Sequence, residues 1–376
     1  MQICESRKCT GCSACQNICP ENCISMTEQT LGHIFPVIDE SRCIGCGACS
    51  RVCPQNNPPA FHSPLLIFAA HSKDSLEHAA STSGGVAAVF SRKFLEGGGI
   101  VYGCSSSLED EIKHIDVTKA NIDDLNLLRG SKYVQSHMGD ILSDVLYCLK
   151  TGKIVLFFGT PCQIAGLLNF IGKPHESLVT VELLCHGVPS QKLLFEHLEE
   201  NGITKGELIS FREKSGSVLR VKKGSQTIYK KSAAKDNYYR AFHKNLTLRE
   251  SCHSCDFAKS ERCADITIGD FWGLGSDAPI SRKNGVSLVL INTQKGKTFW
   301  EAYCQEFSFA ERSLEEAVAG NHPLKFPAPR PKEREQFIKL YEQLGFNAAI
   351  KSVLPQQSSF SLLRRIARKI KHLLKR

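Results

Sequence analysis

The hydrophobic and polar positions between residues 65 and 292 predict strands and helices in alternation. Near-continuous apolar runs at 153–158 and 178–184 are typical of parallel strands that are covered on both faces. Shorter strands are expected at 65–71, 100–102, 208–212, 218–222, 227–230 and 286–292. Helices are expected at 81–96, 122–128, 137–150, 191–200 and 238–246. The pattern therefore predicts a mixed-sheet α/β domain.

The composition changes on either side of this domain. Residues 55–64 hold three prolines and two asparagines and are typical of a linker. The predicted fold class is therefore α+β / α/β: a small module is followed by a mixed-sheet α/β domain in two parts and by a helical C-terminal extension. These parts are expected at residues 1–57, 65–150, 151–324 and 332–376.

Two copies of one cysteine pattern dominate the small module. Cys-Thr-Gly-Cys-Ser-Ala-Cys-Gln-Asn-Ile-Cys-Pro begins at Cys9, and Cys-Ile-Gly-Cys-Gly-Ala-Cys-Ser-Arg-Val-Cys-Pro begins at Cys43. Both fit the bacterial ferredoxin run C-x2-C-x2-C-x3-C-P, whose fourth cysteine binds the cluster of the other copy. Residues 32–38 between them have strand character and fit a small hairpin.

This pattern predicts two [4Fe-4S] clusters in the module. Zinc rarely uses eight cysteines in this repeated form, and disulfides would need an export signal that the chain does not show. Cys4 and Cys23 lie outside the repeat and are interpreted as ordinary thiols without a role. The ligands predicted for cluster one are Cys9, Cys12, Cys15 and Cys53, and those for cluster two are Cys43, Cys46, Cys49 and Cys19.

Two further cysteines follow the buried strands of the α/β domain. Cys162 comes after Thr160, an expected helix cap, and Pro161, which suits the first helical position. A helix N-terminus favours the thiolate form of such a cysteine. A right-handed crossover brings the ends of both strands to one sheet edge, where open α/β sheets bind ligands. Cys162 and Cys185 are therefore expected to be neighbours.

Cys252 and Cys255 form another C-x2-C pair, which is half of a metal site. Cys162 and Cys185 are the natural partners, and Cys263 is the reserve ligand. A third [4Fe-4S] cluster at Cys162, Cys185, Cys252 and Cys255 is the preferred interpretation. A zinc site and a cysteine-based redox pair are the alternatives.

Two loops offer contacts for a phosphate or a flavin. Residues 81–85 open a helix whose free N–H groups and positive dipole end suit a phosphate, although an ordinary N-cap is the alternative. Residues 129–136 carry two cations, an aromatic ring and amides, which suit a flavin or its phosphates; a solvated loop is the alternative. The expected cofactor contacts are Ser83, Gly84, Gly85, Arg129, Ser131, Lys132, Tyr133 and Gln135.

The formal net charge of +9 does not indicate nucleic acid, because most of it lies in one short segment. Residues 361–376 hold seven Lys and Arg and no acid, which leaves +2 for the remainder. Apolar residues in 360–376 fall on one helical stripe, which predicts a basic amphipathic helix for a membrane surface. Docking of this helix on the protein itself or on a partner is the alternative.

The cysteine content and the first residues predict a reducing compartment. The 376-residue chain has 18 cysteines and opens without an apolar export segment. No apolar run approaches the roughly 18 residues needed to span a bilayer. The expected location is the cytoplasm, with peripheral contact at the inner face of the membrane.

Five segments together resemble the coenzyme F420 hydrogenase/dehydrogenase β-subunit family, with a fused ferredoxin. They are Ser83-Gly84-Gly85-Val86, the segment that begins Arg129-Gly130-Ser131, Gly159-Thr160-Pro161-Cys162-Gln163, Cys185-His186-Gly187-Val188-Pro189 and the segment that begins Asp265-Ile266-Thr267. The resemblance covers roughly residues 65–324. It implies an FAD-containing iron–sulfur oxidoreductase that links a two-electron carrier to one-electron clusters and a ferredoxin-type redox partner.

The resemblance leaves the carrier open. Coenzyme F420 needs cations for its phosphate and its polyglutamate tail, and Lys and Arg in 212–231 could supply them; a solvated face is the alternative. One rival interpretation is a membrane-associated reductase of a glycan precursor in surface polysaccharide synthesis. The other is a non-catalytic electron-transfer subunit without a flavin.

Overall fold

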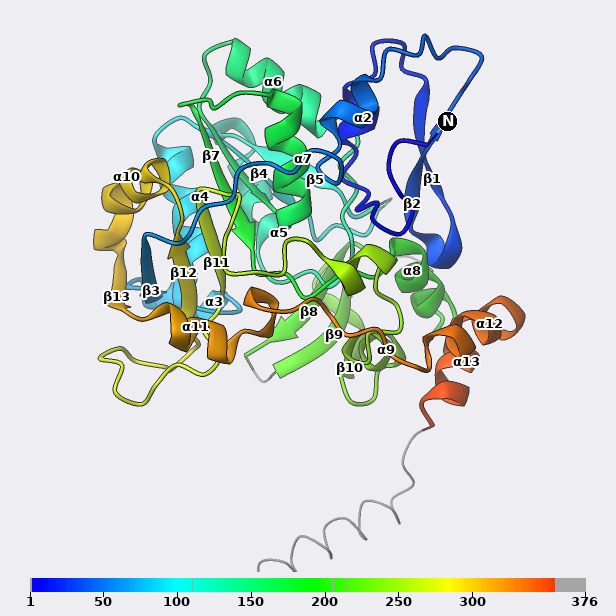
Figure 1. Ribbon diagram of the computed structural model, residues 1–376. Helices are drawn as coiled ribbons and strands as arrows, with labels where there is room; N and C mark the ends of the chain where they lie inside the picture. The colour runs from blue at the N-terminus through cyan, green and yellow to red at the C-terminus, as the bar shows by residue number, and fades with distance from the viewer. Residues whose placement is uncertain (1, 110, 205, 215, 356–376) are drawn as a thin grey trace, which may run out of the picture.

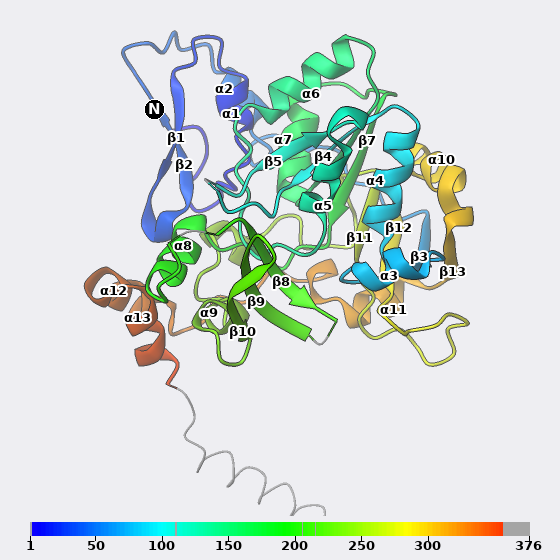
Figure 2. The same cartoon turned by 180° about the vertical axis from the view of Figure 1, so that it is seen from behind.

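The computed structural model describes residues 2–109, 111–204, 206–214 and 216–355. A small N-terminal module, blue in Figure 1, lies against the green segment that carries α6, α7 and α8, and Figure 2 shows the same arrangement from behind. The bounds of these three helices are Ile141–Lys150, Pro161–Ile171 and Gln191–Glu199. The predicted order of a ferredoxin-like module followed by a mixed α/β fold is confirmed.

The N-terminal module is built from a hairpin and two short helices. β1 (Ile24–Glu28) pairs antiparallel with β2 (Ile34–Ile38), as predicted, and η1 (Thr30–Gly32) lies between them. α1 (Ala14–Asn17) and α2 (Ala48–Val52) each lie inside one cysteine repeat. Each helix starts from a left-handed residue, Ser13 with φ 61° and Gly47 with φ 68°. The two repeats therefore turn in the same way.

An eight-stranded mixed sheet forms the centre of the α/β fold. Its order is β13-β3-β12-β11-β7-β6-β4-β5, in which β4, β6, β7 and β11 are parallel. The predicted parallel pairing of the two buried strands is confirmed, because β6 pairs with β7 from Val155↔Leu178 to Gly159↔Glu182. The strand bounds are β3 Leu66–Ser72, β4 Ile100–Cys104, β5 His114–Val117, β6 Val155–Gly159, β7 Leu178–Leu183, β11 Ile266–Asp270, β12 Ser287–Ile291 and β13 Phe307–Glu311.

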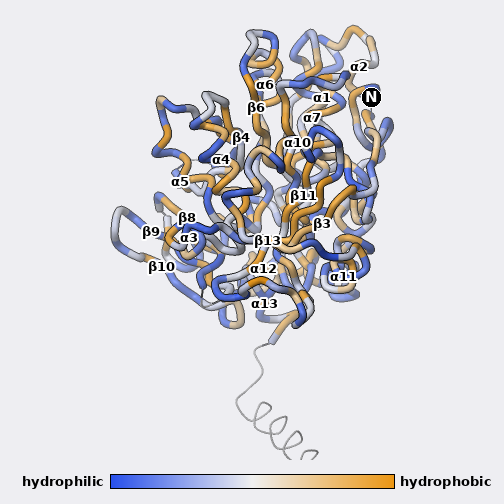
Figure 3. Tube along the Cα trace, turned by 90° about the vertical axis from the view of Figure 1, so that its left-hand side faces the viewer, coloured by the Kyte–Doolittle hydropathy of each residue, from blue (hydrophilic) through white to orange (hydrophobic). Residues whose placement is uncertain are grey.

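Helices cover both faces of this sheet. Side chains alternate along β6, so that Val155 and Phe157 join the core with α6 and α7, whereas Leu156 and Phe158 join the core with α4 and α10. Figure 3 shows the hydrophobic colour concentrated on the central strands. The remaining elements around the sheet are α3 Ser75–Ala80, α4 Val86–Glu96, η2 Lys119–Asp124, α5 Leu125–Leu128, η3 Glu250–Ser254, α10 Gln294–Tyr303, η4 Cys304–Glu306, α11 Leu314–Gly320 and η5 His322–Leu324.

A second, antiparallel sheet has the order β10-β9-β8. It packs with α8 and the C-terminal helices around Phe211, Phe337 and Phe346. The bounds are β8 Leu208–Glu213, β9 Gly216–Lys223, β10 Gln226–Ser232, α9 Asn237–His243, α12 Arg334–Leu344 and α13 Phe346–Val353. The predicted basic helix at 360–376 lies outside the described residues. None of the described helices is long and apolar enough to span a bilayer.

Candidate metal centres and the adjoining loop site

The four cysteines predicted for cluster one are all buried, and three of them share a core with α7, namely Cys12, Cys15 and Cys53. Burial, together with the nearby thiols of Cys9, Cys53 and Cys162, raises the pKa of Cys12 to about 12. Burial and the thiols of Cys12, Cys9 and Cys53 also raise the pKa of Cys15. Thiols with raised pKa values stay protonated at neutral pH, so these cysteines would become thiolates only when a bound metal displaces their protons. The assignment of these four ligands stays a prediction.

The cysteines predicted for cluster two lie around one cavity near the surface. Its lining includes Cys19 and the three thiols of the second repeat, of which Cys46 is exposed. Cys23 also lines this cavity, and its Sγ lies 3.3 Å from the Sγ of Cys19. A fifth thiol therefore adjoins this set, which the position of Cys23 outside the repeat did not indicate.

Cys4 is placed in a similar way beside cluster one. Hydrogen bonds to Cys53 and Cys9, followed by burial, raise the pKa of the Cys4 thiol. Both thiols therefore contact a predicted ligand, and the interpretation of Cys4 and Cys23 as ordinary thiols without a role stays a prediction.

The four cysteines predicted for cluster three converge at the carboxyl edge of the large sheet. Cys162 is the second residue of α7, Cys185 follows β7, and the other two come from η3 and the residue after it. Burial, followed by the thiols of Cys252, Cys162 and Cys255, raises the pKa of Cys185. The structure therefore brings this set together, as the crossover geometry predicted, and the ligand assignment stays a prediction.

Burial and hydrogen bonding act in opposite directions on the pKa of Cys162. Burial raises the pKa of Cys162 to about 11, although the Thr160 hydroxyl lies 3.2 Å from its sulfur and opposes the shift. Burial therefore opposes the thiolate form that the helix N-terminus was predicted to favour, and a bound metal would favour that form.

Cys263, the reserve ligand, faces a buried ion pair. Its Sγ lies 3.5 Å from Glu182 Oε2 and 3.7 Å from the carbonyl oxygen of Pro161. Glu182 is fully buried and is paired with Arg262. Over the described part of the chain, no three His, Cys, Asp or Glu side chains lie close enough to share a single metal ion.

The two loops predicted to contact a flavin lie side by side at the same sheet edge. Thr82 Oγ1 is 3.5 Å from Ser131 Oγ. Gly85 is the N-cap of α4 with φ 85°, and the Gly84 N–H donates to Ser287 Oγ at 3.0 Å. The Gly85 cap adds no side-chain hydrogen bond to the first turn of α4. That turn and the neighbouring loop fit an anionic group such as a dinucleotide phosphate.

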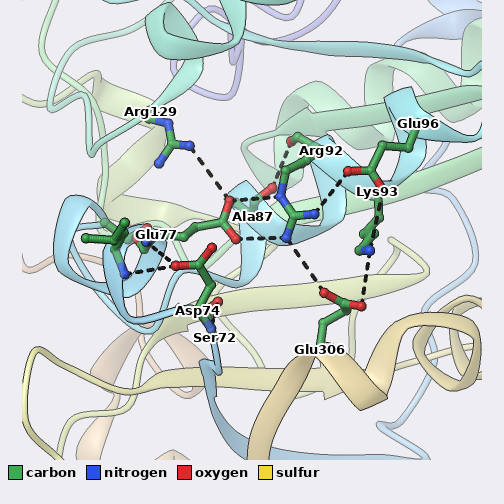
Figure 4. Close-up of polar contacts among 12 residues, drawn as sticks. Ser72, Asp74, Glu77, Ala87, Arg92, Lys93, Glu96, Arg129 and Glu306 are labelled. Carbon is green, nitrogen blue, oxygen red and sulfur yellow. Dashed lines mark hydrogen bonds and ion pairs between the residues drawn. The ribbon is translucent and has the colours of Figure 1, made fainter.

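Arg129 pairs with a buried carboxylate at this loop site. Its Nη2 lies 3.7 Å from Glu77 Oε1, and Glu77 also pairs with Arg92 at 3.2 Å (Figure 4). The Nε of Arg129 is buried and has no hydrogen-bond partner within the described residues. A buried guanidinium N–H without a partner is costly, so it fits a bound acceptor.

Three other residues predicted to contact the flavin make contacts with the protein itself. Lys132 Nζ donates to the carbonyls of Leu128 at 2.7 Å and Arg129 at 2.9 Å, and burial lowers its pKa to about 8. The Tyr133 ring stacks on Phe242 with centroids 5.1 Å apart. Gln135 lies beside cluster one instead, where its Nε2 donates to Thr10 O at 2.9 Å.

Three further residues lie at this edge: Asp270 and Trp272 were not predicted as site residues, and Arg212 was predicted only among the cations for an F420 tail. Asp270 ends β11, forms an ion pair with Arg212 and lies opposite Ser287 in the strand register. Arg212 lies 5.7 Å from the ring centroid of Trp272, which is 59% exposed. Although burial lowers it, Asp270 and Tyr133 hold the pKa of Arg212 above its usual value. The family-like segment 265–273 contains Asp270 and Trp272, but the sequence did not reveal their contacts with Arg212.

Most of the cations predicted for an F420 tail lie elsewhere. Arg220 and Lys230 pair with Glu213 at 2.9 Å on the three-stranded sheet, and Lys231 donates to Asn201 at 2.6 Å. These contacts agree with the alternative of a solvated face.

Comparisons with known proteins follow this division of the chain. Residues 152–316 match the family model that describes the C terminus of the coenzyme F420 hydrogenase/dehydrogenase beta subunit. Residues 8–57 and 35–93 match 4Fe-4S dicluster domains. A solved chain from the F420-reducing [NiFe] hydrogenase complex of Methanosarcina barkeri is 19% identical, with a TM-score of 0.45 over 80% of this chain and 94% of that chain. No curated protein matched the sequence. The predicted resemblance is therefore confirmed: residues 152–316 are similar to the C terminus of the coenzyme F420 hydrogenase/dehydrogenase beta subunit, and residues 8–57 are similar to 4Fe-4S dicluster domains.

Proposed function

We propose that the chain is an iron–sulfur flavoprotein that moves electrons between a two-electron carrier and a one-electron protein partner. The two family matches support iron–sulfur electron transfer of the oxidoreductase type. The proposal adds FAD in the loop site, a third [4Fe-4S] cluster at the sheet edge and a ferredoxin-type partner. Coenzyme F420 is the carrier that the family description favours.

The single observation that carries the proposal is the order of the three cysteine sets from the sheet edge to the surface. The set that contains Cys162 lies at the carboxyl edge of the large sheet, where α7 follows β6. Cys162 is close enough to Cys12 to raise its pKa, and α1 packs on α7. Cys12 is 8% exposed, whereas Cys46 of the next set is exposed. The sets therefore form a buried path with one end at solvent.

The residues at the two ends of this path have different tasks. A bound flavin would exchange an electron pair with a substrate and single electrons with the clusters. The α4 N-terminus and the unpartnered Nε of Arg129 would hold its phosphates, and Arg212 would neutralise an anionic carrier. At the other end, Ile44 is 64% exposed beside Cys46 and offers an apolar contact to a redox partner.

Anaerobic purification with cofactor analysis tests this proposal. We expect FAD, acid-labile sulfide and about twelve iron atoms per chain. Cys162→Ser should lower the iron to about eight, since one cubane loses a ligand. Cys304→Ser is the matched control, because this half-buried thiol lies at the end of α10. Unchanged iron in Cys162→Ser would remove the third cluster, and absence of flavin would favour a non-catalytic electron-transfer subunit.

Contact with a membrane surface is a separate part of the proposal. Its support is the group of seven cations and the apolar stripe in 360–376. A form that ends after Pro355 should lose binding to vesicles that contain anionic lipid, whereas the full chain should float with them. Equal flotation of the two forms would exclude the membrane role and with it the glycan-precursor reductase at that surface.

A further inference from the structure

Arg249 joins the third cysteine set to the ferredoxin module. Its side chain is 1% exposed, and its carbonyl accepts the N–H of Cys252 at 3.0 Å. Its guanidinium reaches the first cysteine repeat, where Nε donates to Cys9 O at 2.7 Å and Nη2 lies 3.5 Å from Cys9 Sγ. Nη2 also donates to Ile34 O at 2.7 Å. One cation therefore lies between two predicted clusters.

The charge of Arg249 has no carboxylate partner in the described part of the protein. Arg262 and Arg334 are also almost fully buried, but Arg262 pairs with Glu182 and Arg334 with Glu250. Two further contacts of Arg249 are with uncharged groups: Gln135 Oε1 at 3.2 Å and the Phe35 ring at 4.3 Å from Cζ. A buried cation without a counter-charge is strongly unfavourable, so the native state must supply one.

The loop of cluster one is shaped to admit this guanidinium. Gly11, between Cys9 and Cys12, has φ 66°, and a Cβ at Gly11 would lie 2.9 Å from Arg249 Nη1. In the second repeat, Gly45 occupies the matching position with open space around it, and the nearby Arg51 is exposed. The buried arginine therefore belongs to cluster one and cluster three and not to cluster two.

We propose that Arg249 is the counter-ion shared by cluster one and cluster three and that it raises the reduction potential of both. The inference rests on the proposed function, since it requires both clusters. Four thiolates give a cubane a net negative charge, and reduction adds one more electron to it. A fixed cation in a dry environment stabilises the reduced form more than the oxidised form. Arg249 is therefore a positioning residue: it holds a positive charge beside the clusters and touches no substrate.

Redox titration of the anaerobically purified protein, followed by EPR, tests the inference. Arg249→Met should shift the potentials of clusters one and three downward and leave cluster two unmoved as an internal control. Arg249→Lys should restore part of the shift because it keeps a charge. Signals are assigned by comparison with Cys162→Ser and Cys46→Ser. A purely structural arginine would not move potentials in clusters that keep their iron.

A second variant keeps the inference testable if Arg249→Met fails to assemble. Gln135→Glu places a carboxylate beside the guanidinium, at the position of an oxygen that is 3.2 Å away. It should neutralise the cation and lower the same two potentials while Arg249 remains in place. If a variant keeps about twelve iron atoms, as three cubanes require, and its potentials do not move, the counter-ion role is overturned and the proposed function stays intact. A wild-type protein without iron would overturn the proposed function itself.

Discussion

Cys12 packs directly against Gly166, so closely that a Cβ at Gly166 would lie 2.9 Å from the Cys12 sulfur. Gly166 is four residues after Cys162 on α7, and residues at this spacing share one helix face. The glycine therefore allows the ferredoxin module to approach the helix face that carries a predicted ligand of cluster three.

The first prediction concerns this contact. Gly166→Ala should destabilise the protein by about 1 kcal/mol or more, because the new methyl overpacks the interface. Gly97→Ala is the matched control. Gly97 follows α4 with φ −72°, and a Cβ there would meet only the Phe94 carbonyl oxygen at an ordinary 3.4 Å and a second carbonyl at 3.7 Å. That change should be neutral or mildly stabilising. Urea unfolding under anaerobic conditions measures both; a Gly166→Ala variant as stable as Gly97→Ala would contradict the prediction.

The second prediction concerns the flavin. Arg129→Gln should weaken FAD binding by about tenfold or more, since a charged hydrogen bond to a phosphate contributes roughly 1.5–3 kcal/mol. Arg92→Gln is the control, because Arg92 pairs with the same Glu77 but also with Glu96 at 3.1 Å on α4. Fluorescence titration of the flavin-free protein measures the affinities. Equal affinities for the two variants would exclude Arg129 from the site.

The third prediction concerns the fifth thiol at cluster two. Cys19→Ser should keep nearly the wild-type iron content, because the Cys23 sulfur lies 3.3 Å from that of Cys19 and can replace it. Cys19→Ser combined with Cys23→Ser should fall from about twelve to about eight iron atoms. Cys46→Ser is the control for loss of a ligand on the exposed side of the cavity. The same iron content in the single and the double variant would show that Cys23 does not substitute.

Short sequence patterns were sufficient to predict features that depend on local geometry. The two cysteine repeats indicated which thiols lie together because three-residue spacing and glycine turns are properties of the short segment itself. The meeting of Cys162 and Cys185 followed from a general rule of parallel sheets, which the pairing of β6 with β7 satisfies. The basic helix at 360–376 falls outside the described residues, so it stays a prediction.

Contacts between distant segments could not be predicted in this way. Arg249 lies 240 positions from Cys9, and Gln135 lies 125 positions from Thr10. Neither residue belongs to a motif that names its partner, so Gln135 was predicted with the flavin loop and Arg249 was not singled out. The raised pKa of Cys162 also depends on burial, and Cys162 packs against a core that includes Cys12, which the helix position alone does not reveal.

The last prediction concerns the pH dependence of stability. His114 is buried, with Nε2 2.9 Å from Phe158 O and Nδ1 3.0 Å from Ser136 Oγ, and burial lowers its pKa to about 4. Because an unfolded histidine has a pKa of about 6.5, the unfolded chain binds more protons below that pH. The free energy of unfolding should therefore fall as the pH drops from about 6.5 to about 4, by roughly 3 kcal/mol from this group. His114→Gln keeps a donor for Phe158 O and should flatten the dependence of the urea midpoint between about pH 7.5 and 5.5. His62→Gln, at an exposed position, should keep the wild-type dependence, and a His114→Gln variant with that same dependence would refute the assignment.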